Sequence, residues 1–162
     1  MKAILYGIGL QFKLDIRSKT LLVTCYLVPL LFFMIMSGIF TSLMQDATQT
    51  LIQSMTIMGV SMGALIGVPP SMVEIYSTNI KKMYSANNVP AFIHLMIMSF
   101  IIFIAAPIIF HASAPENIPL YFFTLALFII VSLSISCVLG LAIKNQAKLT
   151  MYSQIVFLPS IM

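Results

Sequence analysis

Residues 74–90, EIYSTNIKKMYSANNVP, form the longest polar stretch in a chain that is otherwise strongly apolar. Apolar side chains recur in it at helical spacing and share one face: Tyr76, Ile80, Met83 and Tyr84. Asn87 and Asn88 interrupt this pattern, and Pro90 suits the first turn of a following helix. The stretch predicts a short amphipathic helix whose apolar face needs a partner. Of the two candidates, lipid headgroups and another protein, we favour a protein.

The composition around this stretch is that of an integral membrane protein. Of the 162 residues, 60% are hydrophobic and only 7% are charged, whereas about a quarter of the residues of a soluble domain are charged. Short polar blocks separate apolar runs of about 20 residues, the length that crosses a bilayer. The short alternating segments of a membrane β-barrel do not occur in the sequence. We therefore expect an all-α, polytopic helical bundle, and no nucleic-acid partner despite the net charge of +4.

The polar blocks divide a single transmembrane domain, residues 1–162, into its segments. Four full spans are predicted, at residues 20–43, 51–73, 91–110 and 118–143. Residues 1–19 are amphipathic and basic, which predicts an N-terminal helix lying in the membrane interface. Residues 149–162 predict an incomplete fifth span, because 14 residues at about 1.5 Å each do not cross a hydrocarbon core of about 30 Å.

The basic residues predict the orientation of the chain. All eight lie before the first span or after the second and the fourth: Lys2, Lys13, Arg17, Lys19, Lys81, Lys82, Lys144 and Lys148. The opposite loops contain Asp46 and Glu116 and no basic residue. Because basic loops stay on the cytoplasmic side, we expect a multi-pass protein of the cytoplasmic membrane. Its N-terminus and residues 74–90 would lie in the cytoplasm.

Three glycines in the second span recur at intervals of four residues: Gly59, Gly63 and Gly67. Small residues at this spacing lie on one helix face and allow another helix to approach closely. The neighbour is either another helix of the same chain or a second copy of the protein. Pro69 and Pro70 are expected to kink or end this helix just before the polar stretch.

Residue patterns typical of catalysis or of metal binding are missing from the sequence. It contains no G-x-x-x-x-G-K-[ST] loop for nucleotide phosphates and no Cys or His pair at metal-ligand spacing. His94 and His111 lie near opposite ends of the third span and are interpreted as interfacial residues. The spans carry essentially no ionisable groups, which argues against a proton-coupled transporter. We therefore predict no catalytic residue, no metal and no cofactor bound by this chain.

Three consecutive polar residues in the incomplete fifth span could line a transport pathway: Tyr152, Ser153 and Gln154. Ordinary hydrogen bonding between helices is the alternative explanation for these side chains.

In layout, the chain resembles the permease subunits of type-2 ATP-binding-cassette (ABC) exporters. Two blocks carry the resemblance. The first is VEIYSTNIKKMYSANNVPAFIHLMI, residues 73–97, where that family has a polar helix and a turn before its third span. The second is VLGLAIKNQAKLTMYSQIVFLPSIM, residues 138–162, which is similar to the family's junction between the fourth and fifth spans. The family continues beyond this point, so the resemblance implies a chain truncated within its fifth span.

The resemblance implies a transport function in which this chain is not the enzyme. Residues 74–88 would form a coupling helix that binds a separate subunit, and that subunit would bind ATP-Mg and hydrolyse ATP. The residues implied in this contact are Glu74, Tyr76, Ile80, Lys81, Lys82, Met83, Tyr84, Asn87 and Asn88. Two permease subunits, in a homodimer or a heterodimer, would pair around the substrate path. The excess of Lys over Arg and the frequent Ile, Met and Asn residues separately indicate a bacterial source.

Two other interpretations remain open at this point. The chain could be a membrane scaffold or an immunity-type subunit that uses the same fold only to bind partners. It could also be a non-functional fragment of a permease. The cargo is not specified by any of these readings, because a fold shared with exporters does not determine the substrate.

Overall fold

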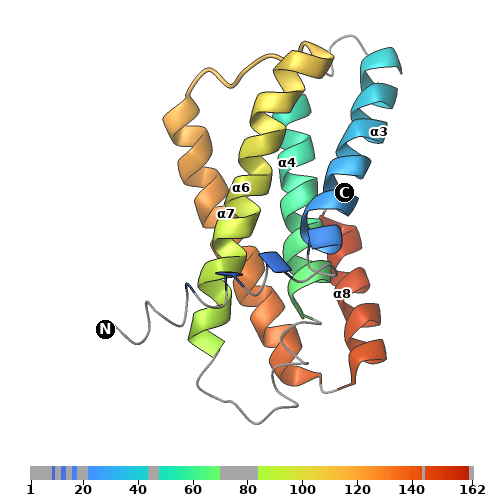
Figure 1. Cartoon of the computed structure of the whole chain (residues 1–162). Coiled ribbons are helices and arrows are strands. Elements are labelled where there is room, and N and C mark those ends of the chain that lie inside the picture. The colour runs from blue at the N-terminus through green and yellow to red at the C-terminus, as the bar shows by residue number, and fades with distance from the viewer. Residues whose placement is uncertain are drawn as a thin grey trace.

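The computed structural model describes Gly9 and residues 12–13, 16–17, 22–43, 48–69, 84–143 and 145–160. Every regular element among them is helical, so the all-α prediction is confirmed. The elements are η1 (Val23–Leu27), α3 (Val28–Leu43), α4 (Leu51–Met62), η3 (Gly63–Gly67), α6 (Tyr84–Phe110), α7 (Ile118–Ala142) and α8 (Gln146–Ser160), where η denotes a π-helical turn. Successive long helices run in alternating directions and form one bundle (Figure 1).

Three helical stretches are long and apolar enough to cross a membrane: Cys25–Ser42, Val89–Phe110 and Ile118–Ala142. They match the predicted first, third and fourth spans, as expected of a multi-pass helical membrane protein. The predicted second span corresponds to Leu51–Gly67, which is apolar but shorter than these three. Most of residues 1–19, the predicted interfacial helix, lies outside the described residues.

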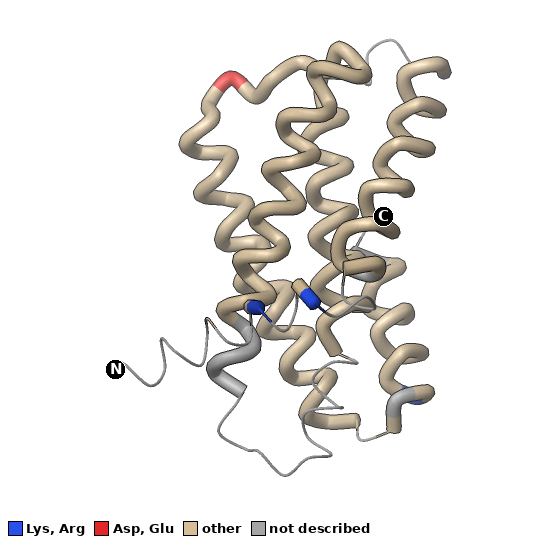
Figure 2. Tube along the Cα trace, viewed as in Figure 1, with Lys and Arg blue, Asp and Glu red and all other residues tan. Residues whose placement is uncertain are grey.

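The two ends of the bundle differ in charge (Figure 2). At one end the Ser113 N–H donates a 3.1 Å hydrogen bond to the Thr48 carbonyl, which joins the loops before α4 and before α7. Glu116 lies in the second of these loops and is exposed, so we refer to this end as the Glu116 end. The described basic residues Lys13, Arg17 and Lys148 are exposed and lie toward the opposite end, here the Lys148 end. This segregation agrees with the charge pattern of the sequence.

The helix expected to begin at Ala91 begins at Tyr84 instead, with Asn87, Asn88 and Pro90 inside it. The asparagines and the proline lower the stability of the helix by less than the sequence suggests. Asparagine lowers helix stability by less than about 1 kcal/mol. A proline here removes only one backbone hydrogen bond near the start of the helix, a loss that membrane helices tolerate where neighbours compensate.

Helices α4, α6 and α7 surround the core. Its largest fully buried apolar side chains are Ile52, Val60, Leu95, Met98, Ile102 and Ile129, together with Leu149 from α8. Apolar side chains also cover the outside of the bundle, and Ile108 on α6 is 71% exposed. Since lipid tails are as apolar as these side chains, close packing and interhelical hydrogen bonds must hold the helices together.

Candidate functional site

Two of the helices change geometry immediately before a proline. The π-helical turn η1 ends at Leu27, two residues before Pro29, and η3 ends at Gly67, two residues before Pro69. A proline lacks the N–H that would donate to the carbonyl four residues earlier, and its ring presses against that carbonyl. In both cases this carbonyl belongs to the π-helical turn, so the wider turn relieves the conflict. Wide turns of this kind bend helices and recur at functional sites.

The two wide turns pack against each other and against α6. They lie in the half of the bundle nearer the Lys148 end, where α4–η3 leaves the bundle and α6 enters it (Figure 1). The stretch between Pro69 and Tyr84, which contains most of the predicted coupling residues, therefore joins two helices beside the place where both wide turns meet.

His94 lies at this junction and is 2% exposed. Its Nδ1 shares a 2.6 Å hydrogen bond with the hydroxyl of Tyr26, a residue of η1. The Phe12 ring stacks on the imidazole, with ring centroids 4.7 Å apart and planes inclined by 14°. The imidazole of His94, which the sequence places near one end of the third span, is thus enclosed within the bundle by the side chains of Phe12 and Tyr26. A buried histidine in a membrane helix is a candidate functional residue.

The sequence contained a partial signal for this burial. His94, Met98, Ile102 and Ala106 are all buried and recur at intervals of four, so they form the inward face of α6. The other faces of α6 are also apolar, which hides this stripe in the sequence. The partner Tyr26 lies 68 positions away, and no pattern within either segment links the two residues.

The glycine face of α4 and η3 lies against α6. A Cβ atom built on Gly59 would lie 3.1 Å from Met98 Cε, and one built on Gly63 would lie 2.5 Å from Leu95 Cδ2. The neighbour of these two glycines is thus a helix of the same chain. Gly67, at the end of η3, is partly exposed. We call this contact between Gly59, Gly63 and α6 the glycine seam.

The predicted coupling residues Glu74, Tyr76, Ile80, Lys81, Lys82 and Met83 lie outside the described residues. Tyr84, Asn87 and Asn88 belong to the first turns of α6, where the structure describes the backbone only.

The predicted pathway residues of α8 do not share one environment. Ser153 is 1% exposed and faces the bundle, whereas Tyr152 is 48% exposed and Gln154 is also exposed. Within the part of the chain that the structure describes, no three His, Cys, Asp or Glu side chains gather as a metal site would require. Comparison of the chain with protein-family models, with curated proteins and with solved structures finds no match.

Proposed function

We propose that this chain is the membrane-spanning permease subunit of an ABC-type exporter. It would form part of the substrate path and couple, through residues 74–88, to a separate subunit that binds ATP-Mg and hydrolyses ATP. The observation that carries the proposal is the junction of η1, η3 and α6 next to the ends of that connecting stretch. A force applied to residues 70–83 acts first on α4–η3, which ends in one wide, bendable turn, and on α6, which packs against both wide turns.

The glycine seam supports the same mechanism. Residues 70–83 link α4–η3 to α6. At Gly59 and Gly63 the backbone of α4–η3 lies directly against side chains of α6. Their contact is the most extensive between two helices of the described bundle. A displacement of the connecting stretch would therefore move both helices together, because packed cores shift as units rather than deform smoothly.

The charge distribution supports one orientation of the protein in the membrane. With the Lys148 end in the cytoplasm, as basic loops prefer, residues 74–88 face a cytoplasmic ATPase and the Glu116 end faces outward. ATP would close the partner's nucleotide-binding domains, the connecting helix would transmit this movement, and the spans would tilt to release substrate outward. A second permease subunit, identical or related, would complete the path within the lipid bilayer.

The test is co-purification of the full chain from native membranes in mild detergent, with a tag on the N-terminus. Mass spectrometry would ask whether a subunit with a nucleotide-binding P-loop accompanies the chain, and ATPase activity would be measured in the same sample. Tyr84→Ala would be compared with Ile108→Ala, a control on the same helix whose side chain is 71% exposed near the Glu116 end.

We expect the ATPase subunit to accompany the wild type and the Ile108→Ala control, and at least a tenfold lower yield of it with Tyr84→Ala. The tenfold loss corresponds to about 1.4 kcal/mol, a typical effect for an aromatic side chain in an interface. Absence of a nucleotide-binding subunit from every sample would contradict the proposal. Equal recovery with Tyr84→Ala would exclude this residue from the contact.

A further inference from the structure

Helix α8 is attached to the bundle by one narrow face. Leu149, Ser153 and Phe157 recur at intervals of four residues and are all buried. The elements that α8 contacts are η3, α7 and α4, so this buried stripe faces them. The remaining circumference of α8 points away from the described bundle.

A second stripe runs along the outer surface of α8. Its members are all exposed: Ala147, Met151, Gln154 and Leu158. Their intervals of four, three and four residues are those of the seam between two helices that cross at about 20°. Most helix pairs in membranes have this geometry. We call these four residues the α8 seam.

The α8 seam enters the depth of the hydrocarbon core. Helix α7 crosses the membrane toward the Lys148 end, and α8 runs back beside it in the opposite direction (Figure 1). Gln154 comes six residues after the exposed Lys148, which at about 1.5 Å per residue places it about 9 Å further along the helix. The interfacial layer of a bilayer is only about 5–7 Å thick on each side. With Lys148 at the headgroups, Gln154 therefore lies beyond this layer.

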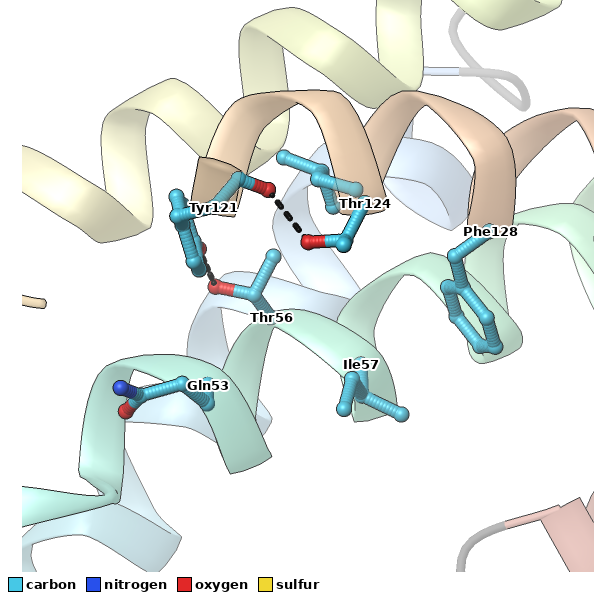
Figure 3. Close-up of a pocket in the computed structure, with 7 residues that line it drawn as sticks. Gln53, Thr56, Ile57, Tyr121, Thr124 and Phe128 are labelled. Carbon is cyan, nitrogen blue, oxygen red and sulfur yellow. Dashed lines mark hydrogen bonds between the residues drawn. The ribbon is translucent and has the colours of Figure 1, made fainter. Parts of the chain in front are cut away.

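Gln154 is a polar side chain that lipid cannot satisfy. Exposed hydroxyls on α7 bond to their own helix: Thr124 Oγ1 is 2.9 Å from the Tyr121 carbonyl (Figure 3), and Ser134 Oγ is 2.8 Å from the Ile130 carbonyl. Gln154 makes no such bond to the described part of the chain. An amide left without a partner in hydrocarbon is unfavourable. Its partner must come from another molecule or from outside the described residues.

A second copy of the chain has the chemistry and the geometry of this partner. All copies insert in the same orientation, so a twofold axis along the membrane normal brings the same residue of both copies to the same depth. A carboxamide contains donors and an acceptor, so two Gln154 side chains can donate to each other. A polar residue within an otherwise apolar seam also fixes the register of the two helices.

We propose that the chain forms a homodimer through the α8 seam. Gln154 of each copy bonds to Gln154 of the other, and Met151 and Leu158 pack on either side of this pair. The inference does not rest on the proposed exporter function. A membrane scaffold could pair through the same face, and exporter subunits could pair through a different one.

The test is energy transfer between full-length chains labelled at the N-terminus with a donor or an acceptor dye. The chains are reconstituted together, without an ATPase subunit, in phosphatidylcholine–phosphatidylglycerol vesicles at falling protein-to-lipid ratio. The ratio at which energy transfer is half-maximal measures the affinity of the dimer.

We expect Gln154→Leu to weaken the dimer about tenfold, because leucine preserves the apolar packing but removes the interhelical hydrogen bonds. Gln154→Asn retains an amide and should lose less affinity than Gln154→Leu. Tyr152 is 48% exposed on another side of α8, so Tyr152→Phe is the control and should leave the affinity unchanged.

Disulfide cross-linking tests the geometry of the same dimer. Cys25 is buried and stays in place, and the less buried Cys137 is replaced by alanine. Met151→Cys and Leu158→Cys should each cross-link two copies, whereas Tyr152→Cys should not.

Energy transfer no greater than that of randomly distributed monomers would overturn the proposal. So would a dimer whose affinity Gln154→Leu leaves unchanged, or cross-linking that favours Tyr152→Cys over Met151→Cys. A dimer that responds to Gln154→Leu would support the α8 seam even if no ATPase subunit accompanies the chain from native membranes, a result that contradicts only the exporter proposal.

Discussion

The two sides of α4 associate with their neighbours by different means. Toward α6, the glycine seam lets side chains of one helix touch the backbone of the other at Gly59 and Gly63. Toward α7, near the Glu116 end, a cavity remains, and a hydrogen bond from Tyr121 to Thr56 bridges the two helices beside it. Small residues and interhelical hydrogen bonds are the two main means of helix association in lipid. Helix α4 therefore packs closely against α6, whereas near the Glu116 end a cavity separates part of α4 from α7.

The largest expected loss of stability comes from Gly63→Leu, which places a large side chain in the glycine seam. A Cβ on Gly63 would already lie 2.5 Å from Leu95 Cδ2, so the additional atoms of a leucine cannot fit without separating η3 from α6. Overpacking typically costs about 1–3 kcal/mol, and we expect the upper end of this range or more. The measurement is the fraction of protein that stays monodisperse in detergent after heating, followed by gel filtration.

Gly38→Leu on α3 is the matched control for this change. A Cβ on Gly38 meets only Phe110 Cε1, at 4.0 Å, so the same substitution has room there. Equal thermal stability of the two variants would show that the glycine seam is not a tight contact.

The sequence predicted the parts of the fold that depend on composition and length. Residues 118–143 were predicted as a span, and α7 covers Ile118–Ala142, because polar loops bound a long apolar run on both sides. The start of α6 was predicted less well. Asparagine and proline are weak helix breakers when neighbouring helices supply the packing, and composition does not reveal that packing.

The candidate site was less accessible to sequence reasoning than the fold. The spacing of Gly59 and Gly63 indicated a close contact but left its partner open between α6 and a second copy, since spacing defines a face and not what covers it. His94 and Tyr26 come together only through the packing of η1 against α6. Gln53 and Thr56 are polar residues near the start of the predicted second span, and the sequence alone does not reveal that both line a cavity against α7.

A smaller effect is expected on the other side of α4, from a double-mutant cycle with Tyr121→Phe and Thr56→Val. These changes remove the two ends of one 2.8 Å hydrogen bond. Interhelical hydrogen bonds in membranes contribute about 0.6 kcal/mol on average, so we expect a coupling energy near this value. Reversible unfolding in mixed micelles would provide the four free energies of unfolding.

Thr124→Val provides the control for this cycle. The Thr124 hydroxyl bonds to the backbone of its own helix, so Thr124→Val should show no coupling with Thr56→Val. Coupling of equal size in both cycles would mean that the measured energy reflects a general loosening of α4 from α7.

The smallest change in the free energy of unfolding is expected from Gly59→Ala, in the glycine seam itself. The new Cβ would lie 3.1 Å from Met98 Cε and 3.4 Å from Ile102 Cδ1, and a methionine terminus can move by the few tenths of an ångström required. Alanine also stabilises a helix by about 1 kcal/mol relative to glycine. These effects oppose each other, so we expect a free energy of unfolding within about 0.5 kcal/mol of the wild type.

Replacing Met98 by leucine should reveal the contact that Gly59→Ala alone conceals. Leucine has a volume similar to methionine but is branched and less adaptable, so by itself Met98→Leu should cost less than about 1.5 kcal/mol. In that background Gly59→Ala can no longer be accommodated by a flexible side chain, and the two changes together should cost more than the sum of their separate effects. An additive result would mean that α6 itself shifts at Met98, so that the seam depends on Gly63 and Leu95 alone.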